Sequence, residues 1–145
     1  MDSRFKGCIE EGKLVKMEIQ MDLVGKEVLA ADFDLRSAEK SLEEKNPKWA
    51  TVQAYYSMFH TAKALVYRKG YREKCHACLS IALRALYENV MDAKHFERFR
   101  DCMNLRNDAD YGMIYSDKSA SEVVEWAKEF LDGARAALKK QPPIS

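Results

Sequence analysis

No segment of this 145-residue sequence is apolar for the ~20 residues that a helix needs to cross a membrane. The residues that follow Met1 also lack the apolar core of a signal peptide. A dominant charge is missing as well, because 24 basic and 23 acidic side chains leave a net charge of +1. No overall field would therefore draw this protein to nucleic acid. These absences predict a cytoplasmic protein that makes no membrane contact and touches any RNA through a local patch.

The common catalytic and nucleotide-binding motifs are absent too: there is no P-loop, GxGxxG, nucleophile elbow or zinc-binding helix motif. Cys75 and Cys78 have the spacing of a metal or redox motif, with His76 between them. A zinc site needs a second pair of ligands, and Cys8 and Cys102 stand alone in the sequence. We therefore predict reduced cysteines packed as small hydrophobic side chains, with no metal and no cofactor. A metal site on Cys75, His76 and Cys78 is the less favoured alternative.

What the sequence does contain is helical periodicity along almost its whole length, and no segment predicts a strand. The length suits one domain, 1–145, with its core at about 22–140. The predicted fold class is all-α: an up-and-down helical bundle of four to five main helices plus a short N-terminal helix. The expected helices span about 6–17, 22–45, 46–69, 75–89, 92–112 and 119–141.

Local signals set several of these boundaries. Asn46 followed by Pro47 predicts a helix start, and Gly70 supplies the left-handed residue that stops this third helix. Its apolar arc is wide, so we expect it to be central and contacted on two sides. Ser119 and Glu122 have the spacing of a capping box and predict the start of the last helix.

The fifth helix carries charges where its apolar stripe predicts core residues. Arg106 and Asp110 lie four residues apart, as do Asn107 and Tyr111, so each pair can interact on one helix face. A partly buried arginine at a helix end can grip a phosphate with its fork of donors. The alternative is a structural ion pair that fixes helix register. The stripe consists of Phe96, Phe99, Met103, Arg106, Asp110 and Met113.

A second candidate cluster lies on the third helix, where Tyr56, His60, Lys63 and Tyr67 follow at steps of four, three and four. His60 beside Lys63 would bind an anion or act as an acid or base near neutral pH. The alternative is a histidine that makes a hydrogen bond within the bundle. The other two histidines, His76 and His95, are expected at helix starts, as caps or surface residues.

Four segments together resemble HEPN domains, most closely the small stand-alone members from bacteria and archaea. These segments are 55–65 (YYSMFHTAKAL), 69–71 (KGY), the expected helix of His76 and 105–112 (LRNDADYG), and the resemblance spans about 22–140. It implies a helical bundle that is commonly a homodimer. Many HEPN domains are metal-independent RNases whose motif is an arginine, then four to six residues, then a histidine, often with Asn or Asp directly after the arginine. Two such motifs meet across the dimer interface.

Carried onto this sequence, Arg106 matches the motif arginine and Asn107 the polar residue after it, while Tyr111 stands at the histidine position. Tyrosine, with a pKa near ~10, is a poor acid or base at neutral pH. The expected RNase activity is therefore weak or degenerate, unless Tyr111 and His60 share the role. We predict catalytic candidates Arg106, Asn107 and Tyr111, with His60, Lys63 and Asp110 as binding residues.

The resemblance also implies biological context, since many stand-alone members are toxins encoded beside a small nucleotidyltransferase antitoxin. RNA or a nucleotide is the expected ligand. Tyr111 and Tyr115 are positioned in the sequence to suit modification by such a partner. The alternative function is a non-catalytic dimeric helical module that docks a partner protein.

Overall fold

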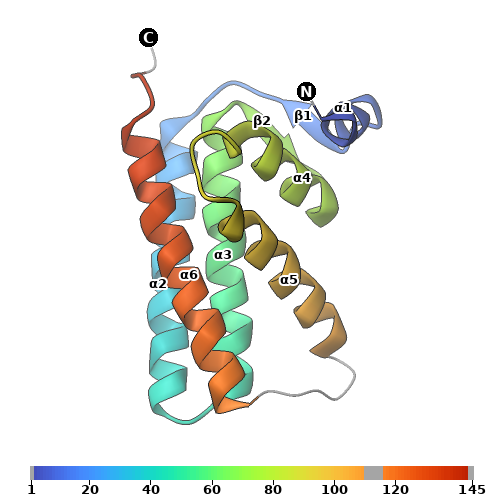
Figure 1. The fold of residues 1–145 in the computed structure, drawn as a ribbon. Coiled ribbons are helices and arrows are strands. Elements are labelled where there is room, and N and C mark those ends of the chain that lie inside the picture. Colours follow the sequence, from blue (N-terminus) through green and yellow to red (C-terminus); the bar gives the residue numbers. More distant parts are fainter. Residues whose placement is uncertain (1, 110–115, 144–145) are drawn as a thin grey trace.

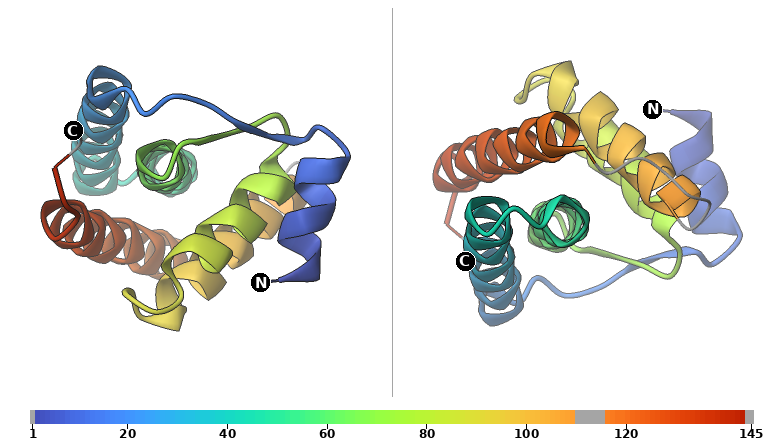
Figure 2. Two further views of the ribbon diagram at one scale, coloured as in Figure 1. Left: turned by 90° about the horizontal axis from the view of Figure 1, so that it is seen from above. Right: turned by 90° about the horizontal axis from the view of Figure 1, so that it is seen from below.

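Three long helices lie side by side, and three shorter ones cross one side of them, as Figures 1 and 2 show. The computed structural model describes residues 2–109 and 116–143, except for the side chains of 105–109. The predicted all-α class is confirmed. The long helices are α2 (Met21–Glu43), α3 (Pro47–Arg68) and α6 (Asp117–Lys139), and the shorter ones are α1 (Ser3–Glu10), α4 (His76–Tyr87) and α5 (Ala93–Ala109).

Helix α3 is the centre of the molecule, as its wide apolar arc predicts. Side chains such as Met58 and Leu65 are fully buried, because α2, α4, α5 and α6 all pack on this helix (Figure 2). The side chain of Asn46 accepts a hydrogen bond from the Trp49 N–H at 3.4 Å, and Gly70 has a φ of +82°. Both predicted boundary signals are confirmed. Among the described residues, no helix combines the length and the apolar character that crossing a membrane requires.

The N-terminal segment differs from the prediction of one helix over about 6–17. Helix α1 ends at Glu10, and strand β1 (Leu14–Lys16) follows it. Gly12, with a φ of +72°, makes the turn between them. Strand β1 pairs antiparallel with β2 (Tyr71–Glu73), directly after α3. Three residues are too few to show an alternating pattern, so the sequence alone predicts neither strand.

Helix α6 begins two residues earlier than the capping-box signal predicts. The cap is Ser116, whose hydroxyl accepts a hydrogen bond from the Ser119 N–H at 3.0 Å. Ser119 is therefore inside the first turn, and the predicted start at this residue is wrong. Two serines three residues apart offer two candidate caps, and the earlier one adds nearly one turn of helix with Asp117 near its positive end.

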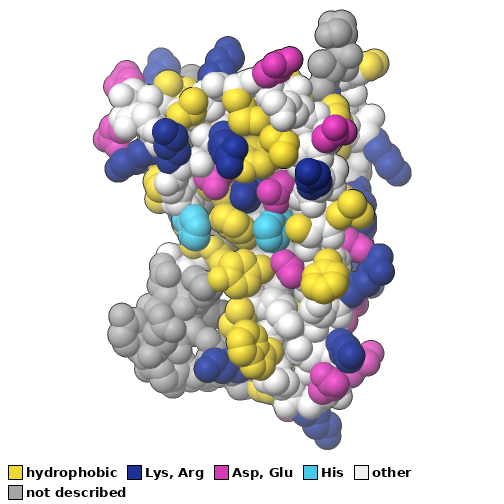
Figure 3. Space-filling view, turned by 180° about the vertical axis from the view of Figure 1, so that it is seen from behind, with side chains coloured by type: hydrophobic (Ala, Val, Ile, Leu, Met, Phe, Trp, Pro, Cys, Tyr) yellow, Lys and Arg dark blue, Asp and Glu magenta, His cyan; other side chains and the backbone are white. Residues whose placement is uncertain are grey.

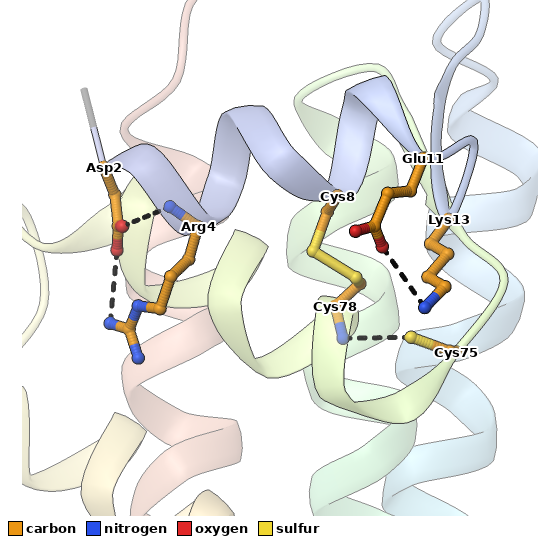
Figure 4. Close-up of a disulfide and its surroundings, with 7 residues drawn as sticks. All are labelled: Asp2, Arg4, Cys8, Glu11, Lys13, Cys75 and Cys78. Carbon is orange, nitrogen blue, oxygen red and sulfur yellow. Dashed lines mark hydrogen bonds and ion pairs between the residues drawn. A yellow bond between two sulfur atoms is a disulfide. The ribbon is translucent and has the colours of Figure 1, made fainter.

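The prediction of four reduced cysteines is also wrong, because Cys8 of α1 and Cys78 of α4 form a disulfide (Figure 4). The bond links residues 70 positions apart in the sequence, a pairing that local spacing cannot reveal. Cys75 is free and caps α4, its sulfur accepting from the Cys78 N–H at 3.3 Å. Cys102 is free and buried, and its pKa is raised to about 12 mainly by burial. Since Cys78 is bonded to Cys8, its sulfur is not an available metal ligand.

Candidate functional site

The predicted motif begins on the last turns of α5, which the structure extends to Ala109. Upstream on this helix, Phe96 and Phe99 are 3% and 0% exposed, and Cys102 is buried, so the helix is fixed firmly to the core. Arg106 and Asn107 are helical in their backbone, but their side chains lie outside the described residues. Asp110, Tyr111 and Tyr115 also lie outside them. The two four-apart pairs of this motif therefore stay predictions.

The other predicted pair, His60 and Lys63, comes together around a carboxylate from the neighbouring helix. Nδ1 of His60 lies 2.6 Å from Oε2 of Glu27, and Nζ of Lys63 lies 3.4 Å from Oε1 of the same residue. Nε2 of His60 lies 3.7 Å from Oδ2 of Asp34. Figure 3 shows a face of the molecule on which histidine side chains lie among acidic, basic and hydrophobic ones.

The surroundings of this cluster favour the charged forms of Glu27 and Lys63. Burial alone would raise the pKa of Glu27, but the hydrogen bond from His60 and the charge of Lys63 outweigh it and lower the pKa. Burial would likewise lower the pKa of Lys63, and the charge of Glu27 raises it instead. Burial raises the pKa of Asp34, against the opposing effect of His60.

This geometry ties α2 to α3 through groups of opposite charge. The hydrogen bond that the sequence offered as an alternative role for His60 is present, with Glu27 as its partner. An anion at this cluster would meet the carboxylates of Glu27 and Asp34 as well as the two bases. The role of His60 and Lys63 as binding residues stays a prediction. The two carboxylates were not anticipated, since they lie on a different helix from the motif.

A groove that the sequence did not indicate lies where α1, α4 and α5 meet. Its cavity volume is 270 Å³, and three arginines line it together with polar and apolar side chains. The arginines come from three different helices: Arg4 from α1, Arg84 from α4 and Arg100 from α5. We call this site the arginine groove; its remaining lining residues are Ala77, Ser80, Ile81, Phe96, Met103 and Asn104.

Neighbouring groups contact two of the three arginines of the groove, Arg84 and Arg4. Cζ of Arg84 lies 6.0 Å from the centre of the Phe96 ring, a cation–π contact. Arg4 pairs with Asp2 at 3.2 Å, and the disulfide at Cys8 attaches its helix to α4, as Figure 4 shows. The only sequence signal for the groove is a polar residue four positions from an arginine on both α4 and α5. That signal is common on exposed helix faces and therefore does not single out a site.

His95 is a further departure from the sequence-based expectation of a cap or surface residue. Its side chain is 7% exposed and stacks on Phe130, with ring centres 5.6 Å apart. Its Nδ1 is buried and has no hydrogen-bond partner among the described atoms. Burial, then the charges of Lys94 and Arg98, lower its pKa below 6.5. His76 lies at the start of α4 as expected, and its ring lies 4.9 Å from that of Phe59.

Comparisons with known proteins give a family model and two relatives. A family model described as "HEPN domain" matches residues 28–137. "Putative toxin MJ0605" of Methanocaldococcus jannaschii is 32% identical over 114 residues, covering 76% of this chain and 84% of the relative. "Putative toxin MJ0142" of the same organism is 33% identical over 86 residues, covering 53% of this chain and 58% of the relative.

Proposed function

The chain belongs to the HEPN domain family, and from this premise we propose that it is the toxin of a toxin–antitoxin pair that acts on or binds RNA. Both relatives carry the word toxin in their names, which supports this role. The proposed active form is a cytoplasmic homodimer with Arg106 and Asn107 of both subunits at a shared site. Asp110 and Tyr111 complete that site, and a small nucleotidyltransferase is the proposed antitoxin.

The observation that carries this proposal is the arginine groove, because α5 contributes to it and then continues into the motif. Arg100 and Met103 line the groove, and Arg106 follows Met103 by three residues, so these two positions share a face of the same helix. Guanidinium groups bind phosphate through paired, charge-assisted hydrogen bonds. A strand of RNA lying in the groove would thus be held by its phosphates beside the motif arginine.

Local binding of this kind also fits the charge of the molecule. A net charge of +1 supplies no general attraction for a polyanion. Three arginines from separate helices concentrate positive charge at one place instead. The His60 cluster is a weaker candidate for phosphate binding, because Glu27 contacts both of its bases.

The test is incubation of the purified protein with RNA in the absence of metal. We expect weak cleavage that the Arg106→Ala variant loses, and RNA binding that the Arg84→Gln and Arg100→Gln variants weaken. Arg135→Gln is the matched control, since Arg135 lies on α6 and contacts Asp32 of α2 at 3.5 Å, away from the groove. Equal cleavage by the parent and the Arg106→Ala variant would remove Arg106 from the mechanism.

The second candidate function is a non-catalytic dimeric module that docks its partner protein. Tyr111 at the position of the motif histidine favours it, since tyrosine suits neither acid nor base catalysis near pH 7. Co-expression with a neighbouring nucleotidyltransferase, followed by mass spectrometry, separates two forms of this role. A modified Tyr111 or Tyr115 would support enzymatic control, whereas an unmodified chain in a stable complex would support docking alone.

A further inference from the structure

Helix α2 exposes a row of large hydrophobic side chains at steps of four and eight residues. Leu29 and Phe33 are each 70% exposed, and Met21 is 51% exposed. Gly25 falls between Met21 and Leu29 in the same row, and a Cβ added there would meet no atom within 4 Å. Residues four apart lie on one face of a helix, so these side chains form one continuous strip. We call it the α2 strip.

The strip faces away from the proposed RNA site. Helix α2 packs on α3 and α6, and between the described residues of α2 and α5 there is no contact. Figure 2 shows α3 between α2 and α5. Figure 3 shows hydrophobic side chains standing out of the surface on the side of the molecule that α2 occupies. A continuous apolar strip on a solvent-exposed surface is typical of a site that a partner covers.

Consider α2 of a second copy that runs antiparallel to this one, related to it by a two-fold axis that passes beside Leu29. The side chains of the two α2 helices are then complementary. Leu29 then meets its own copy. Phe33, four residues beyond the axis, meets Gly25, four residues before it, so that a large ring faces a position without a side chain. An interface of this symmetry repeats each such contact twice.

The charges beside the strip obey the same symmetry. Asp22 and Arg36 each lie seven residues from Leu29, and they meet across the axis with opposite charge. Asp32 already contacts Arg36 and Arg135 within its own chain, so Asp22 of the second copy would extend a row of alternating charges. Lys26 and Asp32, each three residues from Leu29, come to the same height on opposite edges of the contact and do not pair. In a parallel arrangement each charge would instead face its own copy.

We propose that the α2 strip is a contact surface for a second copy of this chain, antiparallel and centred on Leu29. The contact is independent of the proposed dimer at Arg106, which lies on the other side of α3. One pair of helices buries less than the ~1,200 Å² of a standard stable interface. The association is therefore reversible and depends on protein concentration.

Charge reversal tests the proposed contact without touching the core. Asp22→Arg places like charges opposite each other, and so does Arg36→Asp. Exposed pairs contribute up to about 1 kcal/mol each, so each single reversal should raise the dissociation constant roughly tenfold. The double variant restores opposite charges and should return it to near the parent value. Sedimentation velocity over a concentration series measures all four proteins.

The outcomes distinguish this inference from the proposed function. If the Arg106 dimer also forms, the single variants lose one step of assembly and keep the other. A particle mass unaffected by Asp22→Arg and Arg36→Asp at every concentration overturns the α2 contact and leaves the RNA site untouched. Failure of the double variant to recover overturns the antiparallel pairing.

Cysteine cross-linking tests the register directly. Leu29→Cys should form a covalent dimer on mild oxidation, because the two sulfur atoms would meet at the axis. Gly25→Cys and Phe33→Cys should cross-link when mixed and not separately. The parent protein shows how much cross-linking arises from the free Cys75. Lys128→Cys on the exposed face of α6 is the matched control. Cross-linking of Lys128→Cys as efficient as that of Leu29→Cys would overturn the proposed register.

Discussion

Glu27 is the residue on which the polar contacts between α2 and α3 converge, since both His60 and Lys63 contact its carboxylate. Its pKa lies below the ordinary value of 4.5 in the folded protein. The unfolded chain therefore binds more protons as the pH falls from above 4.5 through the lowered pKa, and folding stability decreases over that range. The charged carboxylate contributes its full stability at neutral pH.

We expect Glu27→Gln to lower the free energy of unfolding at pH 7 by about 1.5–3 kcal/mol, the range for hydrogen bonds to charged groups. The variant should also lose part of the decline below pH 4.5. Urea unfolding followed by circular dichroism at pH 7 and pH 4 measures both effects. Glu39→Gln, at an exposed position of the same helix, is the matched control. An acid decline equal in Glu27→Gln and the parent would contradict this assignment.

His95 should give stability a second dependence on pH. Burial lowers its folded pKa below 6.5, so the unfolded chain takes up a proton more readily, and stability falls as the pH drops below 6.5. His95→Phe keeps an aromatic ring on Phe130 and removes the titrating group. We expect this variant to unfold with less pH dependence between 5 and 7 in thermal melts. His76→Phe, at an exposed position, should melt with the parent's dependence.

Among the elements, α1 depends most on one covalent bond, since in the described part of the chain it packs on α4, β1 and, through Phe5, Tyr71 of β2. The Cys8–Cys78 disulfide closes a loop of 70 residues, and bonds of this kind contribute about 2–4 kcal/mol. Reduction should loosen α1 before the central helices, and with it Arg4 of the arginine groove. Limited trypsin digestion should cut near Arg4 and Lys6 faster in dithiothreitol.

Two cysteine variants separate the bond from other effects of reduction. Cys8→Ser should digest at the rate of the reduced parent even without dithiothreitol. Cys75→Ser keeps the disulfide and should digest at the rate of the oxidised parent. Identical rates for Cys8→Ser and the oxidised parent would show that packing alone holds α1.

Each correctly predicted element has its signal within a few neighbouring residues. Asn46, Pro47 and Gly70 set the ends of α3 through local backbone preferences, and the apolar arc between them predicts its central position. The strands were missed because pairing between Leu14 and Glu73 depends on residues far apart in the sequence. The disulfide and the contacts of Glu27 with His60 and Lys63 are long-range for the same reason.

The same distinction between local and long-range signals applies to the candidate site. The motif at Arg106 is contiguous, so the sequence alone indicates it. The arginine groove needs three helices to bring Arg4, Arg84 and Arg100 together, and α1 is held there by a disulfide that spacing does not reveal. The motif at Arg106 therefore stays a prediction from local sequence, while the arrangement of the groove arginines could not be predicted from it.

At the scale of the whole molecule, a net charge of +1 supplies no general attraction for RNA. The salt dependence of the proposed RNA binding should therefore depend on the few local contacts with phosphate. The logarithm of the binding constant falls linearly with the logarithm of the salt concentration. On a single strand, each neutralised phosphate makes this slope more negative by ~0.7. The three groove arginines and Arg106 give a slope of roughly −3 for each RNA-bound protomer. Fluorescence anisotropy with a labelled single-stranded RNA, over a series of salt concentrations, measures it.

Removal of one groove contact should change that slope by a defined amount. Arg100→Gln should make it shallower by ~0.7, because one phosphate contact fewer releases one fewer group of counterions. Arg135→Gln should keep the parent's slope, since Arg135 lies on the other side of α3 from the groove and contacts Asp32. Equal slopes for the parent and Arg100→Gln would place the RNA outside the groove. A slope much steeper than the four arginines allow would instead indicate binding over a broad surface, which the balanced charges of this chain do not favour.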